Sequence, residues 1–351
     1  MGVRSDGRPN IRLDIRPEVR ASGSSIRERL KTFLGAEPGR FIMGLSDGDI
    51  EAITELRLRV DMPMIVRLGR VDYVLTERGK SACTSSIPYK PSAAAIAETI
   101  ERISQYSFYA FEAELSHGYI TLPGGHRVGV CGQAVVENGV VRGWRHISSI
   151  NFRIAHAVKG CGDGVLPYIF EEVQDCAKVT TKAALIGYAN GYARGLYNTM
   201  IISPPGAGKT TLLRDIVRQI SEMGQTVGLV DERSEVAGCY LGVAQNDVGM
   251  RTDVLDGCPK AVGMVMLLRA MAPDVIAVDE LGGKDDAEAV EAVLTAGVRL
   301  VCTAHGYSLD DVRKNPYMAG LTNRKVFERY VILRAPGLTP AILDGEGKSL
   351  V

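Results

Sequence analysis

Long apolar runs are missing from this sequence of 351 residues. The best candidate, residues 262–281, is interrupted by Arg269, Pro273, Asp274, Asp279 and Glu280. A membrane-spanning helix needs about 18 or more consecutive apolar residues, so no span is predicted. Residues 1–25 contain no apolar core and therefore predict no signal peptide. We expect a cytoplasmic protein that contacts a membrane through a partner.

The sequence also lacks an excess of charge of either sign and a cysteine pattern typical of disulfides. The 41 basic and 41 acidic residues give a formal net charge of zero, which argues against a main affinity for nucleic acids or other polyanions. Seven scattered cysteines include no C-x-x-C pair, so reduced thiols are expected instead of a disulfide framework or a zinc site. A hydrophobic fraction of 46% and a charged fraction of 23% are typical of a globular protein, here long enough for two domains.

A glycine-rich turn between a predicted strand and a predicted helix is the most informative feature. It reads Ser-Pro-Pro-Gly-Ala-Gly-Lys-Thr-Thr over residues 203–211 and follows the apolar run 199–202. Residues 212–220 then place their apolar side chains at helical spacing. Such a turn directs backbone N–H groups and a helix N-terminus toward phosphate oxygens. It fits the pattern G-x-x-x-x-G-K-[ST], except that Ser203 stands at the first glycine position.

This turn predicts a site for ATP and Mg²⁺. The predicted nucleotide-binding residues are Ser203, Pro204, Pro205, Gly206, Ala207, Gly208, Lys209, Thr210 and Thr211. Lys209 is expected to contact the β- and γ-phosphates, and the Thr210 hydroxyl to ligate Mg²⁺. The alternative is a strand-to-helix turn that contains a lysine by chance.

Three further apolar runs end in polar residues. Residues 226–230 lead into Asp231-Glu232, residues 275–278 into Asp279-Glu280, and residues 300–302 into Thr303-Ala304-His305. Ligands of open parallel α/β sheets bind at the carboxyl ends of the strands. The pattern therefore predicts an α/β domain with a parallel sheet, whose polar strand ends share one edge with the phosphate loop.

Charge suggests a role for each of these residues. Asp279 is predicted to hold Mg²⁺, directly or through water, and Glu280 to orient and deprotonate the attacking water. His305, as a neutral donor, and Thr303 are candidates for sensing the γ-phosphate or the water. For the acidic pair the alternative is a set of solvated loop carboxylates, and for the histidine a structural role.

Two further groups of candidates have a less specific pattern. Asp231 and Glu232 are candidates for supporting the metal or the water. Phosphoryl transfer also uses an additional cation, often an arginine supplied across an interface. The candidate arginines are Arg57, Arg59, Arg153, Arg251 and Arg269.

The rest of the chain predicts four segments. These are a tail (1–25), an α+β domain (26–157), a connector (158–195) and the phosphate-loop domain (196–351). The tail is interpreted as solvated and mobile, or alternatively as an arm for phosphate or lipid surfaces. In the α+β domain we expect helices at 26–34 and from Ser92, and strands at 56–60, 64–68, 71–75, 118–122, 127–136, 140–142 and 149–154. The connector is expected to contain a helix over 165–177, with the joint between domains at 178–194.

These motifs resemble the stage III sporulation protein AA family of endospore-forming bacteria. The segments that carry the resemblance are 203–215, 231–238, 251–256, 258–261 and 303–306, with 122–129 and 147–155 in the first domain. The resemblance covers residues 30–345 and leaves the tail and residues 175–192 unexplained.

More distantly, the chain resembles the ATPases of type II and type IV secretion and of pili. Their acidic box is matched by Asp231-Glu232, their histidine box by 303–306, and a Leu-Arg-x-x-Pro-Asp run, with one extra residue, by 268–274. Where those ATPases usually have Gly-Glu, this chain has Asp279-Glu280. The assignment of Asp279 as a direct metal ligand therefore depends on the general phosphate-loop pattern.

The resemblance implies a RecA-like core, preceded by the smaller α+β domain, that assembles as a hexameric ring. It also implies a motor in the mother cell that powers a secretion-like channel to the forespore through an integral membrane partner. Two other functions stay open: a nucleotide-dependent nucleic-acid motor or binding protein, and a ring subunit that binds nucleotide without turnover.

Overall fold

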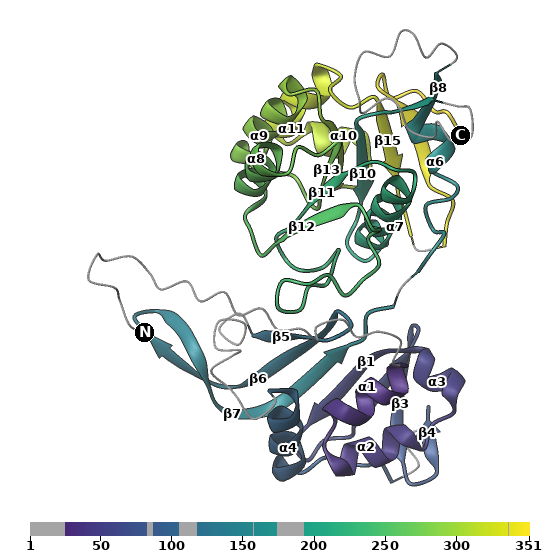
Figure 1. Cartoon of the computed structure of the whole chain (residues 1–351). Helices are drawn as coiled ribbons and strands as arrows, with labels where there is room; N and C mark the ends of the chain where they lie inside the picture. Colours follow the sequence, from purple (N-terminus) through teal and green to yellow (C-terminus); the bar gives the residue numbers. More distant parts are fainter. Residues whose placement is uncertain (1–24, 83–86, 105–117, 157, 174–192, 336) are drawn as a thin grey trace.

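The chain forms two lobes in a computed structural model that describes residues 25–82, 87–104, 118–156, 158–173, 193–335 and 337–351. The first lobe lies below the second in Figure 1, and the segment after residue 154 leads from one to the other. The interpretations of the tail and of a joint at 178–194 concern residues that lie almost entirely outside this description. In the described part of the chain, no helix has both the length and the hydrophobicity needed to cross a bilayer.

The first lobe combines an antiparallel sheet with helices. Its sheet has the strand order β4-β3-β2-β1-β7-β6-β5. The strands are β1 (Ile53–Arg59), β2 (Ile65–Leu68), β3 (Val71–Thr76), β4 (Gly79–Ser81), β5 (Tyr119–Leu122), β6 (His126–Glu137) and β7 (Val140–Arg153). The helices are α1 (Ile26–Phe33), α2 (Ala36–Met43), α3 (Asp47–Glu51) and α4 (Ala93–Ile103). Their buried side chains form one core with the strands.

Local sequence signals explain several of these elements. The Ser25 hydroxyl caps α1 in a capping box with Glu28, and Ser92 caps α4 as predicted. Leu56 and Leu58 alternate with arginines along β1 and are fully buried, which confirms the predicted strand.

The prediction of two separate strands over 140–142 and 149–154 is wrong. Strand β7 is continuous for 14 residues and pairs with the 12 residues of β6. Three register shifts in this pairing allow the longer β7 to stay paired with β6 along its length. The polar stretch between the two predicted strands stays in the sheet because backbone hydrogen bonds to β6 need no apolar face. Asn138 and Gly139 both have positive φ, 52° and 77°, as a tight hairpin turn requires.

The second lobe is built on a seven-stranded sheet. Its order is β12-β11-β13-β14-β10-β15-β16, parallel except for the antiparallel pair β15–β16. The strands are β10 (Thr199–Ser203), β11 (Val227–Asp231), β12 (Thr252–Asp256), β13 (Val275–Val278), β14 (Arg299–His305), β15 (Arg329–Ile332) and β16 (Ala341–Asp344). The helices are α7 (Lys209–Glu222), α8 (Lys260–Ala270), α9 (Lys284–Thr295), α10 (Leu309–Arg313) and α11 (Pro316–Asn323).

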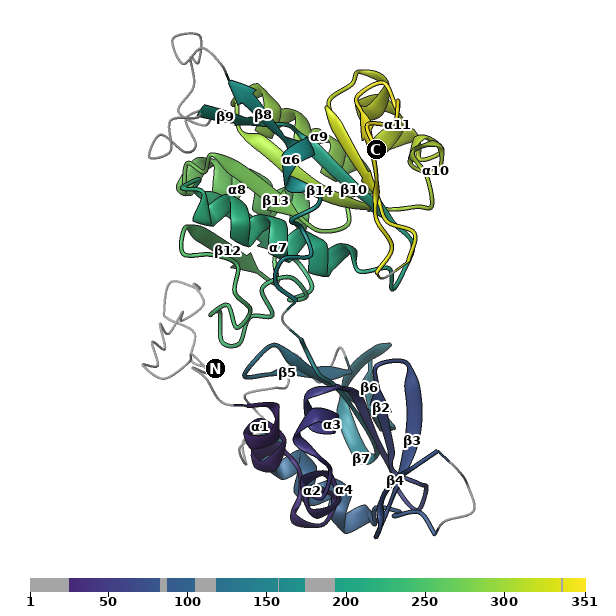
Figure 2. The same cartoon turned by 90° about the vertical axis from the view of Figure 1, so that its right-hand side faces the viewer.

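Helices cover both faces of this sheet (Figure 2). Helix α7 packs on one face in a core with β10, β11, β13 and β14. Helices α8, α9, α10 and α11 pack on the other face in a second core. The central strands are buried on both sides and consist mainly of apolar residues, as parallel strands usually do.

The helix predicted over 165–177 ends much earlier. Helix α6 spans only Leu166–Ile169, and strand β8 (Phe170–Val173) follows and pairs with β9 (Ala193–Leu196). The described part of that prediction is therefore wrong after residue 169. Ile169 and Phe170 are buried in the α7-side core, so this part of the expected connector packs with the second lobe.

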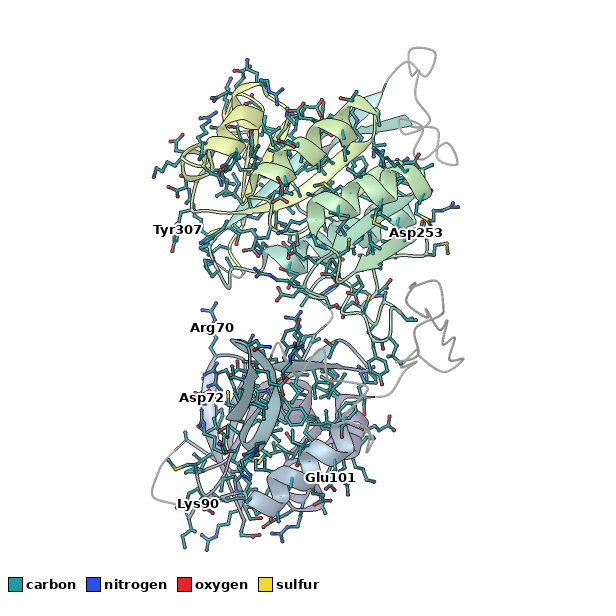
Figure 3. All side chains as sticks on the ribbon, turned by 90° about the vertical axis from the view of Figure 1, so that its left-hand side faces the viewer. Arg70, Asp72, Lys90, Glu101, Asp253 and Tyr307 are labelled. Atoms are coloured by element: carbon teal, nitrogen blue, oxygen red, sulfur yellow. The ribbon has the colours of Figure 1, made fainter. Side chains whose placement is uncertain are left out.

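The loop between β11 and β12 of the second lobe contacts the first lobe. Its Gln245 Oε1 accepts a hydrogen bond from the Gly124 N–H at 3.1 Å. Its Glu235 pairs with Arg127 of β6 at 2.7 Å. Tyr240 of the same loop packs against the core of the first lobe. In Figure 3 the labelled Arg70, at the β2–β3 turn, also points from the first lobe toward the second.

Candidate nucleotide-binding site

The phosphate loop leaves the end of buried strand β10 and enters α7. Gly206 and Gly208 adopt φ values of 74° and 99°, a region in which a side chain is strained, so these glycines allow the turn. Helix α7 is 14 residues long and has no side-chain cap at its first turn. Its first N–H groups are therefore available to an anion, and the helix dipole favours negative charge there.

Ser203, the departure from the written pattern, has a structural place. Its side chain is fully buried, and its hydroxyl donates to the Pro204 carbonyl at 2.8 Å. The Ser203 carbonyl accepts from the Gly306 N–H at 3.2 Å, which ties the loop to the end of β14. A side chain at this position is thus accommodated inside the loop and does not line the cavity described below.

Two side chains of α7 meet the acidic pair after β13. Lys209 Nζ lies 3.4 Å from Asp279 Oδ1 and 3.9 Å from Glu280 Oε1. Thr210 Oγ1 donates to Asp279 Oδ2 at 2.9 Å. Lys209 and Asp279 are both mostly buried. The structure therefore brings together four predicted residues from two elements that are distant in sequence.

Thr303 of β14 fixes the geometry of the acidic pair. Its hydroxyl donates to Asp279 Oδ1 and accepts from the Glu280 N–H at 2.8 Å. Glu280 has a φ of 62°, unusual for a residue with a side chain, and the bond to Thr303 stabilises this conformation. Thr303 is fully buried, so we assign it to positioning the acidic pair.

Lys209, Thr210 and Glu280 line a cavity of about 410 Å³. That volume falls within the range of about 300–1,000 Å³ typical of small-molecule sites. The lining residues are Pro205, Gly206, Gly208, Lys209, Thr210, Thr211, Arg233, Glu235, Glu280 and His305. The free helix N–H groups and Lys209 fit a nucleotide phosphate chain. The oxygens of Thr210 and Asp279 fit Mg²⁺, which prefers hard oxygen ligands.

Arg233 belongs to the site although the sequence assigned it no role. Its Nη1 pairs with Glu280 Oε2 at 3.1 Å. Glu232, beside it, pairs with Lys260 Nζ at 2.8 Å. The only sequence signal for Arg233 was its place directly after the acidic residues 231–232.

Asp231 anchors the loop that carries Arg233 and Glu235. It is buried, and its carboxylate accepts N–H bonds from Glu235, Val236 and Ala237 at 2.9, 3.0 and 2.8 Å. Burial raises the pKa of Asp231, and the three N–H groups oppose that rise. Asp231 does not line the 410 Å³ cavity, but with Glu232 and Arg233 it lines a small pocket that reaches Asp279 and Glu280, so this arrangement supports a positioning role.

His305 lies at the cavity with its ring oriented by the loop. Its Nδ1 is 3.2 Å from the Ser203 carbonyl, and a carbonyl only accepts, so Nδ1 carries a proton. In the neutral ring Nε2 then has no proton. In this arrangement the ring N–H is used by the Ser203 carbonyl, and the predicted role of His305 as a neutral donor stays a prediction.

The candidate arginines lie in different places. Arg269 is in the last turn of α8, and Arg251 precedes β12; both are at the edge where the parallel strands begin, opposite the phosphate loop. Arg57 and Arg59 lie on β1 of the first lobe. The structure therefore brings none of these four into the cavity of this chain. Arg153 lines a separate cavity between the lobes.

Comparison with known proteins finds similarity over most of the chain. A family model described as "Sporulation stage III, protein AA" matches residues 25–350. Stage III sporulation protein AA of Bacillus subtilis (strain 168) is 38% identical over 308 residues, which cover 85% of this chain and 89% of that protein. The uncharacterized protein ycf45 of Porphyra purpurea is 34% identical over 125 residues, or 35% of this chain and 22% of that protein.

A solved structure shares the architecture. The ATPase DotB of Legionella pneumophila superposes with a TM-score of 0.51 and 15% identity, over 89% of this chain and 82% of that one. At this identity the likeness shows the fold, and it does not transfer an activity. It confirms the predicted α/β fold with a RecA-like phosphate-loop core preceded by a smaller α+β domain.

Proposed function

Because the chain belongs to the stage III sporulation protein AA family, as its motifs predicted, we propose that it is a Mg²⁺-dependent ATPase. One observation carries this proposal: Lys209, Thr210, Asp279 and Glu280 converge beside the uncapped N-terminus of α7. A lysine, a hydroxyl, a metal-binding carboxylate and a second carboxylate are the groups that phosphate-loop ATPases require.

Each of these residues has a distinct task. Lys209 and the N–H groups of the loop bind and orient the β- and γ-phosphates. Thr210 and Asp279 hold Mg²⁺, which when bound neutralises the charge that develops on the phosphate oxygens. Glu280 orients the attacking water and accepts its proton.

The base is restrained in the arrangement described here. Glu280 pairs with Arg233 at 3.1 Å and lies 3.9 Å from Lys209. Both cations hold the carboxylate in this position. Nucleotide phosphates compete with Glu280 for the two cations, so binding ATP frees the carboxylate to contact water.

In the cell we propose that the chain works as a homo-oligomer, with a hexameric ring as the specific expectation. The ring acts in the mother-cell cytoplasm at the membrane, where an integral membrane protein of a channel complex between mother cell and forespore binds it. The proposed function is to power that secretion-like channel. Family membership supports the sporulation context, and the fold shared with the ATPase DotB is compatible with an ATPase core.

The test is phosphate release from Mg-ATP as a function of protein concentration, with and without candidate membrane partners. We expect a rate per subunit that rises as oligomers form, and no turnover in Lys209→Ala. The matched control is Lys284→Ala, which removes an exposed lysine at the start of α9. If assembled wild-type protein hydrolysed ATP no faster than Lys209→Ala, the proposal would be contradicted. Stimulation by single-stranded nucleic acid with strong salt dependence would favour the nucleic-acid motor instead.

A further inference from the structure

A second cavity, of about 190 Å³, lies between the lobes. Arginines enter it from both sides: Arg127 of β6 and Arg153 of β7 from the first lobe, and Arg214 of α7 from the second. Glu235 is the carboxylate in its lining, and it lines the nucleotide cavity as well. The two cavities are therefore neighbours but differ in their charged groups.

The register of the sheet places two of these arginines side by side. Arg127 is directly opposite Arg153 in the β6–β7 pair, so both side chains leave the same face of the sheet. Like charges at such positions repel each other. Glu55 opposes Arg153 on its other side, but its carboxylate is bound by Arg57 at 2.9 Å and Arg67 at 3.1 Å. Among the described residues Arg153 has no ion-pair partner within 4.0 Å, so its charge is not balanced locally.

The other two arginines are only partly satisfied. Arg127 pairs with Glu235 through Nη1 at 2.7 Å, but its Nη2 is buried and has no hydrogen-bond partner in the described part of the chain. Arg214 donates Nε and Nη2 to the backbone carbonyls of Val236 and Glu235 at 2.6 and 2.7 Å. These neutral carbonyls orient the guanidinium, while the carboxylates of Asp231 and Asp279, which do not line this cavity, act on it electrostatically. Three cations thus face one carboxylate across a small cavity.

We propose that this cavity between the lobes binds inorganic phosphate. Guanidinium groups bind tetrahedral oxyanions with paired, charge-assisted hydrogen bonds. A phosphate ion would supply the counter-charge that Arg153 lacks and would add a second negative charge to a lining that holds three arginines and one carboxylate. The cavity is smaller than the roughly 300 Å³ at which sites for larger ligands begin, so it fits a phosphate ion better than a whole nucleotide.

The source of that phosphate follows from the neighbouring cavity. Glu235 borders both cavities, and Arg214 lies on the helix that begins at Lys209. Phosphate released at the nucleotide site would therefore have a second cationic site directly beside it. This assignment as a product site rests on the proposed ATPase activity, whereas phosphate binding itself does not.

The test is calorimetric titration of the full chain with inorganic phosphate in chloride buffer. Lys209→Ala removes the loop lysine that would also attract phosphate, so this variant is the background. We expect it to bind one phosphate, and Arg153→Gln in the same background to weaken binding at least about tenfold, because a charge-assisted pair is lost. Arg145→Gln is the matched control: it is exposed on the same strand and lies outside the cavity. Arg153→Lys keeps the charge without the planar fork and should give an intermediate affinity.

Lack of phosphate binding to Lys209→Ala, or equal binding after Arg153→Gln in a variant with unchanged circular dichroism, would overturn the site. A second titration uses wild-type protein saturated with Mg²⁺ and a non-hydrolysable ATP analogue. Phosphate should still bind with the same affinity, because the two cavities are separate. Displacement of phosphate by the analogue would overturn the proposal, since the cavity would then take the terminal phosphate of a nucleotide. Phosphate binding in a chain without ATP turnover would refute the proposed function and leave this site standing.

Discussion

Thr210 Oγ1 donates a hydrogen bond of 2.9 Å to Asp279 Oδ2, although 69 positions separate the two residues in the chain. One oxygen belongs to the first turn of α7 and the other follows the end of β13. The contact exists because β10 and β13 end at the same edge of the parallel sheet, with β14 between them. This contact places the two proposed Mg²⁺ ligands within hydrogen-bonding distance of each other.

Replacing Glu280 with glutamine should abolish hydrolysis and preserve ATP binding. Glutamine keeps the size of the side chain but does not accept a proton from water, so we expect turnover to fall by about 10²–10⁴-fold. The measurement is steady-state phosphate release together with ATP affinity by titration. Glu288→Gln, an exposed change on α9, should behave like the wild type. Turnover that survives Glu280→Gln would show that another group is the base.

Asp279→Asn should raise the Mg²⁺ concentration needed for half-maximal hydrolysis. The substitution removes one negative charge from the proposed metal site, and we expect a shift of about tenfold or more. Hydrolysis is measured across a Mg²⁺ titration, and chelation should stop it in the wild type. Asp285→Asn provides the control, because this aspartate is exposed in the first turn of α9. An unchanged Mg²⁺ requirement in Asp279→Asn would remove Asp279 from the metal site.

Thr303 offers a test of positioning. Thr303→Ala leaves the Glu280 N–H and one oxygen of Asp279 without their buried partner. We expect a stability loss of about 1–3 kcal/mol and a lower kcat. Thr303→Ser retains the hydroxyl and should restore most of the kcat. If serine and alanine lower kcat equally, the hydroxyl is not what positions the acidic pair.

His126 should make the first lobe sensitive to acid. It is buried, its Nδ1 accepts from the Ala155 N–H at 3.1 Å, and burial, aided by Arg29, lowers its pKa to about 4. A histidine kept neutral in the fold contributes stability above its unfolded pKa of about 6.5, and that contribution is lost as the pH falls toward 4. The lost stability should approach about 3 kcal/mol at pH 4.

The single tryptophan provides the measurement for this prediction. Trp144 lies on β7 and packs against the first-lobe core, so its fluorescence during urea unfolding reports that lobe. In His126→Gln the loss of stability between pH 7.5 and pH 4.5 should be smaller than in the wild type. His146→Gln, an exposed change on β7, should lose as much as the wild type. Equal losses in His126→Gln and the wild type would mean that His126 titrates normally.

Local patterns predicted much of this protein. A parallel sheet with a ligand-binding edge was predicted from the phosphate loop, the helix after it and the polar ends of apolar strands. Short segments of sequence are enough for this, because they indicate where a strand ends and which side chains follow it. The helix start after Ser92 was likewise predicted from a few neighbouring residues, and the Ser92 hydroxyl caps α4.

Long-range pairing decided the rest. The continuity of β7 depends on its partner β6, and the strand after Ile169 depends on pairing with β9. The hydrogen bonds of Thr303 to Asp279 and Glu280 depend on the register of β13 and β14. The contacts of Arg127 with Arg153 and Glu235 depend on the pairing of β6 with β7 and on the packing of the two lobes. The sequence by itself determined which chemical groups are present and which strands end in them. The tertiary structure decided which groups touch, because register and packing join residues whose separation along the chain carries no local signal.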